Sequence, residues 1–258
     1  HGPYSLEKDY RTLFRWTEHH DWFLDEGIFV LPSSPSSGMN NYNSLRMLPE
    51  YPEGSSNYTT TNNNWGRVRP SRFAIEYILL YSGAQPDPEV GICLHTTDPR
   101  WNASFLHNFN RQENHVVTPI HTYPPYYEGM TAKDRDALIS PSKAAKTYDM
   151  PYYRKYLDPS YDVTVGKAHM YLVRLAELYL ISAEAAVHLG MKDEAISRLN
   201  EIRARARDSY DKVAGAVAPD CPPAYDESEF DSDDDLLTAI FWERQIELSA
   251  EGHERVDV

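Results

Sequence analysis

The hydrophobic positions of the chain are most regular between Tyr171 and Arg207. Apolar residues recur there every three or four positions, the spacing at which side chains share one face of a helix. Gly190 interrupts the pattern where a positive φ, which glycine adopts readily, would end the first helix. The pattern predicts two antiparallel helices, over 171–189 and 192–207, joined by a short turn. Their predicted faces are Leu172, Leu175, Tyr179, Ala183 and Ala186, then Ala195, Ile196, Leu199, Ile202 and Ala206.

Two further stretches have helical spacing. The stretch from Arg69 to Ser82 places Pro70 in a first turn and is followed by Gly83, which favours a helix end. The stretch from Asp233 to Ala250 begins with aspartates, which suit the positive end of a helix dipole. Both are predicted helices, and the first presents one shared face of Phe73, Tyr77 and Leu80.

The remaining chain before residue 165 is less regular. We predict a helix over 5–20, a buried strand over Glu26–Leu31 that ends at Pro32, and a long loop over 49–66. Residues 92–96 resemble a short strand that runs into a turn at 97–101. Prolines interrupt residues 102–166, so we expect loops, a few short strands and one short helix near 131–138.

Composition narrows the possible functions. The 18 Pro, 19 Tyr and 5 Trp are unusual for an all-helical protein and concentrate before residue 165. A formal net charge of −14 argues against nucleic acid or an anionic membrane surface as the partner, because both favour a basic patch. Cys93 and Cys221 can be read as a disulfide or as two separate thiols; we favour the thiols, and no zinc-site spacing occurs.

Several short motifs follow one another in order along the chain. Asp98-Pro99-Arg100 comes first, the two predicted helices follow, and the run WERQIELSAEGHERVDV comes last. That run contains Glu243-Arg244, Glu247-Leu248, Glu251-Gly252-His253 and Asp257. In these motifs the chain resembles the C-terminal half of the SusD/RagB family, most strongly over 168–257. It departs at Glu254-Arg255, where an Arg and then an aromatic residue are common in the family.

The resemblance implies a mainly α fold. Its TPR-like helical hairpins would form an α-α superhelix that carries a loop-rich, partly β ligand-binding decoration. We expect one unit over 1–258, with the ligand-binding part in 1–165 and the helical scaffold in 166–258. Family members are longer than this chain. The family's N-terminal helical repeats, signal peptide and lipid anchor are therefore expected to lie outside these residues.

The resemblance also implies a non-catalytic role on the extracellular face of the outer membrane of Bacteroidetes-type bacteria. Family members capture oligosaccharides or polysaccharides and release them into a SusC-like TonB-dependent transporter. Such a protein needs no cofactor, binds no nucleic acid, and meets the membrane only through its N-terminal lipid anchor. Two alternatives stay open. A RagB-like protein would capture peptides, and an acidic surface suits basic ones; a plain TPR-type interaction module should show more repeats.

One loop has the chemistry of a sugar site. A sugar ring offers C–H faces to aromatic rings and hydroxyl groups to amides and charged side chains. In the resembled family, the loop ahead of the middle helix commonly faces the ligand. Here that loop supplies Tyr58 and Trp65 as rings, with Asn62, Asn63, Asn64 and Arg67 as hydrogen-bond partners. The alternative role of Trp65 is to fill the gap between loop and helix.

A second aromatic group is also a candidate for ligand binding. Tyr123, Tyr126 and Tyr127 surround the Pro124-Pro125 pair, which stiffens the backbone. They could equally form a surface buttress without a ligand. Trp101 follows the Asp98-Pro99-Arg100 motif and is predicted to be a core residue.

The carboxylates near the C-terminus suggest chemistry but fit a structural role better. Glu243, Glu247 and Glu251 repeat every four residues and so share one side of a single helix, whereas a glycosidase needs two carboxyl groups facing each other across a sugar. We predict a structural network of ion pairs, in which Glu177, Glu184 and Arg174 act as internal struts. The predicted network comprises Arg174, Glu177, Glu184, Glu243, Arg244, Glu247 and Glu251, with Arg255, Asp98 and Arg100.

Overall fold

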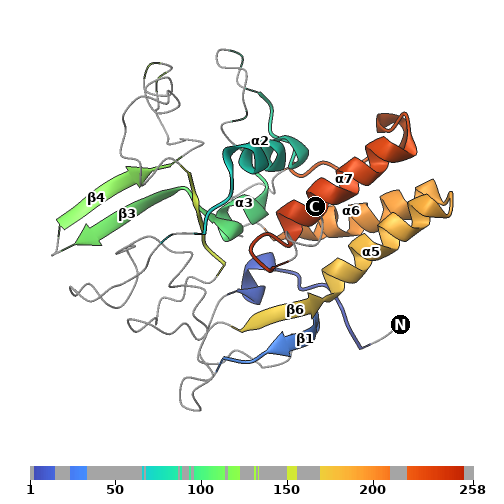
Figure 1. Ribbon diagram of the computed structural model, residues 1–258, viewed down its shortest axis with the longest axis horizontal. Helices are drawn as coiled ribbons and strands as arrows, with labels where there is room; N and C mark the ends of the chain where they lie inside the picture. Colours follow the sequence, from blue (N-terminus) through green and yellow to red (C-terminus); the bar gives the residue numbers. More distant parts are fainter. Residues whose placement is uncertain are drawn as a thin grey trace.

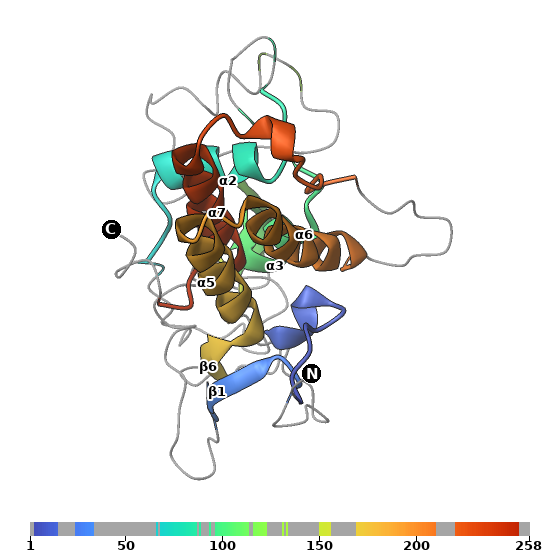
Figure 2. The same ribbon diagram turned by 90° about the vertical axis from the view of Figure 1, so that its right-hand side faces the viewer.

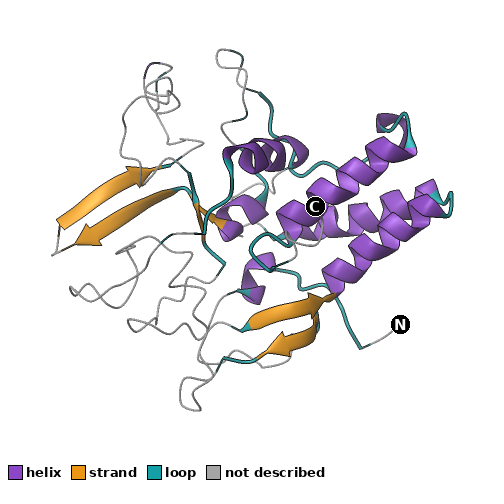
Figure 3. Ribbon diagram, in the orientation of Figure 1, coloured by secondary structure: helices purple, strands orange, loops and turns teal. Residues whose placement is uncertain are grey.

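The structure is a computed structural model, and three helices form its most regular part (Figures 1 and 3). Helices α5 (Leu175–His188) and α6 (Lys192–Asp208) form an antiparallel pair, and α7 (Asp233–Glu247) packs against α5 (Figure 2). No helix in the described part of the chain is long and apolar enough to cross a membrane. The structure describes residues 3–14, 24–33, 66, 68–86, 88, 93, 96–113, 116–122, 131, 133, 150–155, 169–209 and 220–252.

Gly190 lies in the turn between α5 and α6, where the chain reverses its direction. This glycine has a φ of +72°, a left-handed conformation that costs glycine little, so the chain reverses there without strain. The Gly190 N–H donates to the Val187 carbonyl and the Met191 N–H donates to the Ala186 carbonyl, which satisfies two carbonyls of the last turn. The predicted hairpin is confirmed.

The first helix of the pair begins later than its sequence pattern suggests. Residues Met170–Arg174 form strand β6, which pairs antiparallel with β1 (Gly27–Leu31), and α5 begins only at Leu175. The buried face of α5 is accordingly rotated from the predicted one. It consists of Ala176, Leu180, Ala183, Ala186 and Val187.

An apolar core lies between α5, α6 and α7. Leu180 of α5, Leu199 and Ile202 of α6, and Leu236 and Ile240 of α7 are almost completely buried within it. Ser232 caps α7, since its side chain accepts a hydrogen bond from the Asp235 N–H. The connection before α7 contains a short 3₁₀ helix, η3 (Glu227–Glu229), whose following residue Phe230 joins the core.

Helix α2 (Arg72–Tyr81) packs on α7 from the other side. It begins directly after its cap Ser71, so Pro70 precedes the helix and does not lie in its first turn as predicted; Gly83 follows the helix end with a φ of +89°. The face formed by Phe73, Tyr77 and Leu80 is not its buried face, because Phe73 is 61% exposed and Leu80 is also exposed. The buried residues of α2 are Ile75, Ile78 and Leu79.

The strands form three separate antiparallel pairs. Strand β2 (Phe105–Leu106) pairs with β5 (Tyr152–Tyr153), and β3 (Asn108–Glu113) pairs with β4 (Val116–His121) as a hairpin that extends from the helices (Figure 1). The strand predicted over Glu26–Leu31 is confirmed as β1, but its predicted burial is wrong, since Phe29 is 55% exposed and Leu31 is also exposed. A two-stranded ribbon leaves one side of each strand uncovered unless another layer packs on it.

Two other local predictions also differ from the structure. The segment after Asp98 is a short helix, α3 (Pro99–Ser104), because the Asp98 side chain caps it and Pro99 suits its first turn. Near the N-terminus the described helical residues are only the 3₁₀ turn η1 (Tyr10–Leu13), and residues 15–20 lie outside the described part. Most of the predicted strand at 92–96 and most of the predicted helix near 131–138 also lie outside it.

Candidate functional site

The nine residues predicted to bind a ligand lie outside the described part of the chain. The structure does describe the points where their two segments join the fold. It also describes the charged residues predicted to form a network, except Arg255. The predicted ligand residues are Tyr58, Asn62, Asn63, Asn64, Trp65, Arg67, Tyr123, Tyr126 and Tyr127.

The first segment joins the fold just before α2. Gly66 is buried with a φ of +52°, and the chain then passes through Arg69 to the cap of α2 at Ser71. The Arg69 guanidinium carbon lies 5.2 Å from the centroid of the Tyr152 ring, a cation–π contact. The end of this segment is therefore attached to strand β5.

The second segment begins directly after β4. Thr122 is buried, and both its N–H and its hydroxyl donate to the His107 carbonyl, at 2.9 and 3.0 Å. The His107 ring also packs against Trp101, with 5.3 Å between ring centroids. Since His107 directly follows β2, this segment starts at the same two-stranded unit, β2–β5, that Arg69 contacts.

The β2–β5 unit is itself held by an aromatic core. The rings of Trp101 and Phe105 lie 4.8 Å apart, and those of Phe105 and Tyr153 lie 5.6 Å apart. All three side chains are buried in one cluster with Ile75 and Leu79 of α2. Trp101 is thus a core residue, as its sequence position suggested. The end of the first candidate segment and the start of the second are therefore both fixed to this one packed unit.

A second feature links that unit to the helices. Ten ionisable side chains in the described part of the chain are buried and form a continuous set of ion pairs, which we name the charged junction. Five are cationic and five are carboxylates, so their formal charges cancel. The charged junction consists of Arg100, Lys155, Arg174, Arg203 and Arg205 with Glu26, Asp98, Glu243, Glu247 and Glu251.

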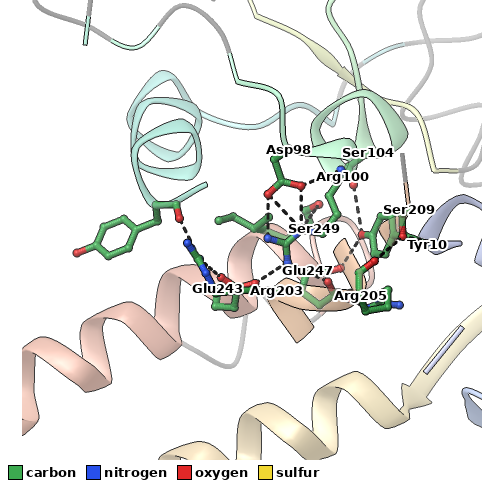
Figure 4. Close-up of polar contacts among 12 residues, drawn as sticks. Tyr10, Asp98, Arg100, Ser104, Arg203, Arg205, Ser209, Glu243, Glu247 and Ser249 are labelled. Carbon is green, nitrogen blue, oxygen red and sulfur yellow. Dashed lines mark hydrogen bonds and ion pairs between the residues drawn. The ribbon is translucent and has the colours of Figure 1, made fainter. Parts of the chain in front are cut away.

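Glu247 lies at the centre of the charged junction (Figure 4). Its carboxylate accepts hydrogen bonds from Arg174 at 2.7 Å and Arg100 at 3.0 Å, and from Arg205 as well. These arginines come from β6, α3 and α6, whereas Glu247 ends α7. One carboxylate thereby joins four elements that are far apart in the sequence.

The main chain at the end of α7 is part of the same junction. The Glu247 carbonyl accepts hydrogen bonds from the Tyr10 hydroxyl, the Lys155 ammonium and the Arg174 guanidinium. The last carbonyls of a helix lack partners within the helix and carry the negative end of its dipole. The two cationic donors therefore stabilise this helix end, and the Tyr10 hydroxyl fixes the N-terminal segment to it.

The other carboxylates are each held from two sides. Glu251 accepts from Lys155 at 2.7 Å and from Arg174 at 2.8 Å. Glu26, just before β1, accepts from Arg174 at 2.6 Å and from Arg205 at 2.9 Å.

The same pattern continues toward α2. Glu243 bridges Arg100 at 2.5 Å and Arg203 at 2.7 Å. The Asp98 carboxylate accepts hydrogen bonds from two guanidinium N–H groups of Arg100. Arg203 also donates a hydrogen bond to the Tyr81 carbonyl at the end of α2.

Burial and ion pairing set the pKa values of this cluster. Burial alone would raise the pKa of Glu247, but Arg205, Arg174 and Arg100 outweigh it and hold that pKa well below its usual range. The pKa of Glu251 is lowered in the same way by Arg174 and Lys155, which outweigh its burial. Burial lowers the pKa of Lys155 to about 8, because Glu251 offsets only part of its desolvation.

The predicted network and the charged junction overlap in part. Arg174, Glu243, Glu247 and Glu251, with Asp98 and Arg100, belong to the junction. Glu184 is not an internal strut, because its side chain is 48% exposed and forms a surface ion pair with Arg244 of α7. Glu177 is half-buried, and Arg255 lies outside the described part.

Four members of the charged junction were missed from the sequence: Glu26, Lys155, Arg203 and Arg205. Arg203 and Arg205 are two positions apart on α6, a spacing that ordinarily places one of two residues in solvent. Nothing in the pattern around Lys155 distinguishes it from a surface lysine. The arrangement can hold segments together, because each carboxylate is engaged by cationic side chains in the folded interior.

Comparison with known proteins gives the family. The model of the SusD family matches residues 25–258. SusD-like protein P38 from Formosa agariphila is 33% identical over 131 residues, covering 50% of this chain and 22% of that protein. A SusD-like protein of Bacteroides fragilis matches 99% of this chain and 47% of its own, with a TM-score of 0.57 and 19% identity.

A further solved structure, surface glycan-binding protein A from Bacteroides uniformis, matches 97% of this chain and 40% of its own. Its TM-score is 0.52 and its identity to this chain is 17%. The chain spans less than half the length of each of these relatives. The structural matches show the fold: mainly α, with TPR-like helical hairpins and a loop-rich, partly β decoration.

Proposed function

The chain belongs to the SusD family, and on this premise we propose that it binds glycans at the bacterial cell surface. The bound oligosaccharide or polysaccharide is delivered to a SusC-like TonB-dependent transporter in the outer membrane, and no bond is broken. The family match over residues 25–258 carries this proposal. It is supported by the glycan-binding role in the name of one protein with the same fold, surface glycan-binding protein A from Bacteroides uniformis.

The proposed binding surface is formed by the two aromatic segments. Trp65 and Tyr58 supply flat rings for the C–H faces of a sugar, and Asn63, Asn64 and Arg67 supply hydrogen bonds to its hydroxyl groups. Tyr123, Tyr126 and Tyr127 extend this surface from the second segment. The contacts of Arg69 with Tyr152, and of Thr122 with His107, support one joint site because the first segment ends and the second begins at the β2–β5 unit.

The helices then serve as a scaffold that touches no ligand. In this proposal the charged junction holds the β2–β5 unit against α6 and α7, because Arg100 of α3 is ion-paired to Glu243 and Glu247. A preorganised site loses less conformational entropy when the ligand binds. The ion pairs would therefore act on affinity indirectly, by keeping in place the two points where the segments join the β2–β5 unit.

Replacing one aromatic ring tests this proposal. An oligosaccharide array identifies the ligand, and calorimetric titration then compares the unmodified chain with Trp65→Ala. Loss of a stacking ring should weaken binding by about 1 kcal/mol or more, roughly a fivefold rise in Kd, with little change in melting temperature. Phe29→Ala is the matched control, because Phe29 is an exposed ring on β1 and lies outside both candidate segments.

The outcomes separate the possible functions. Unchanged affinity in Trp65→Ala would remove this loop from the site while leaving glycan binding intact. Binding of basic peptides in place of sugars would replace the glycan proposal with peptide capture. Turnover of any bound oligosaccharide would contradict the non-catalytic part. Copurification of a TonB-dependent transporter from the native outer membrane tests the delivery step.

A further inference from the structure

Three polar side chains meet at the surface of the β2–β5 unit. The His107 Nε2 lies 2.9 Å from the Asn102 Oδ1, and the Arg154 guanidinium donates a hydrogen bond to the Asn102 carbonyl at 3.1 Å. Asn102 and Arg154 are exposed, and His107 is half-buried. Asn102 lies in α3, the short helix directly before β2, and not in the scaffold helices α5, α6 and α7. We name these three residues the polar patch.

The polar patch is fixed to the packed interior beneath it. The His107 ring packs on the buried Trp101 ring, with 5.3 Å between their centroids. The Arg154 N–H donates to the Ser104 carbonyl at 2.7 Å, and the next residue, Lys155, is buried in the charged junction. Polar groups that are held in place before a ligand arrives lose less conformational entropy when it binds.

The polar patch also lies where both candidate segments join the fold. The His107 carbonyl accepts both hydrogen bonds of Thr122, the residue after which the second segment begins. Arg154 directly follows β5, and the Tyr152 ring of β5 is contacted by Arg69 at the end of the first segment. An amide, an imidazole and a guanidinium are therefore gathered between the attachment points of the two aromatic segments.

We propose that the polar patch is the hydrogen-bonding part of the glycan site, beside the rings of the two segments. This inference rests on the proposed glycan binding and deepens it, because it assigns described side chains to that site. An arginine has five N–H donors, so Arg154 can bind a sugar hydroxyl while it holds the Asn102 carbonyl. The Asn102 amide offers two further N–H donors.

The rings and the polar patch have different tasks in this site. An aromatic ring stacks on the C–H face of many sugars and so contributes affinity with little selectivity. A site that pairs with a particular hydroxyl discriminates strongly against an analogue that lacks it, because its own polar groups are then left unpaired. Asn102 and Arg154 thus select the hydroxyl pattern of the bound sugar.

Two substitutions test this assignment, with affinity and stability measured together. Calorimetric titration uses the tightest-binding oligosaccharide of the array. Arg154→Met keeps the aliphatic stem, removes the donors and should raise Kd about tenfold; Asn102→Ala should raise it about threefold, because neutral hydrogen bonds contribute less. Both side chains are exposed, so the melting temperature should change by less than about 2 °C. Arg198→Met, which removes a surface arginine of α6, is the control and should leave Kd unchanged.

Deoxy analogues of the same oligosaccharide distinguish a direct contact from a structural role. In each analogue one hydroxyl is replaced by hydrogen. One analogue should bind the unmodified chain about tenfold more weakly than the parent sugar, yet bind Arg154→Met as well as the parent sugar does. Two changes that remove the same hydrogen bond are not additive, whereas a structural role for Arg154 would leave their effects independent.

Two results would overturn this inference while glycan binding stands. The first is unchanged affinity of both variants when Trp65→Ala weakens binding. The second is that every deoxy analogue loses as much affinity in the variants as in the unmodified chain, which would make the polar patch a structural feature only. Absence of any oligosaccharide binding by the unmodified chain would contradict the proposed function itself, and this inference with it.

Discussion

The two halves of α7 are buried by different means. Its first half contributes Leu236, Ala239 and Ile240 to the apolar core between the three helices. Its second half contributes Glu243 and Glu247 to the charged junction, where they are equally buried. One helix thus passes from an apolar interior into an ionic one within a few turns.

The apolar core and the charged junction differ in how strictly they fix geometry, more than in how deeply their side chains are buried. Apolar contact is non-directional, so the apolar core tolerates small shifts of its helices. An ion pair between buried groups requires a defined geometry, and the energy of such a pair is offset by the cost of removing both charges from water. We therefore expect the apolar core to supply most of the stability and the charged junction to fix how the segments before α5 are placed.

The largest expected effect follows from removing the central carboxylate. Glu247→Gln leaves the cations of Arg100, Arg174 and Arg205 without their shared counter-charge in the interior. The free energy of unfolding should fall by about 3–5 kcal/mol, measured by urea denaturation.

The matched control for this change is on the surface. Glu184→Gln removes the exposed partner of Arg244 and should cost less than about 1 kcal/mol. If Glu247→Gln does not fold, Glu251→Gln provides the second test, because Glu247 still engages Arg174 in that variant. Similar small losses for all of these changes would mean that the charged junction does not hold the fold.

A somewhat smaller effect is expected in the apolar core. Leu180 of α5 is fully buried among residues of α6 and α7, so Leu180→Ala removes buried surface and leaves a cavity. The free energy of unfolding should fall by about 2–4 kcal/mol. Glycan affinity at temperatures where the variant is folded should not change. A large affinity loss at full folding would show that the scaffold contributes to the site directly.

The same comparison explains what the sequence could predict. The helices α5, α6 and α7 are evident from apolar spacing, because burial of an amphipathic face leaves a periodic pattern. The buried face of α5 is rotated from the apolar face that the spacing predicts, and α2 buries other residues than its shared face of Phe73, Tyr77 and Leu80, because both helices are apolar on two sides. Periodicity then locates a helix without showing which side is buried.

The charged junction was predictable only in part. Asp98, Arg100, Glu247 and Glu251 were identified through the family motifs, whereas Glu26, Lys155 and Arg205 were missed. An ionisable residue is usually solvated, so its sequence context carries no sign of burial; only the tertiary contacts reveal it. The proposed ligand residues, Trp65 among them, remain predictions that rest on side-chain chemistry and on the family.

The smallest expected effect is a dependence of stability on pH, which the charged junction should show and the apolar core should not. The pKa of Lys155 in the folded chain is about 8, below its usual value of 10.5, because burial disfavours its charged form. Between these values the unfolded chain binds a proton that the folded chain has released. Stability from this group should therefore rise with pH above about 8, by about 1 kcal/mol per pH unit.

Lys155→Met isolates this contribution, since methionine keeps the length of the side chain and cannot titrate. The difference in free energy of unfolding between the unmodified chain and this variant should grow from pH 8 to pH 9.5. Measurements should stay below pH 10, because burial raises the pKa of Tyr10 and Tyr171 above their usual values and their effect on stability has the opposite sign there. A difference that stays constant with pH would show that Glu251 keeps Lys155 charged, and that even the weakest cation of the charged junction does not titrate in this range.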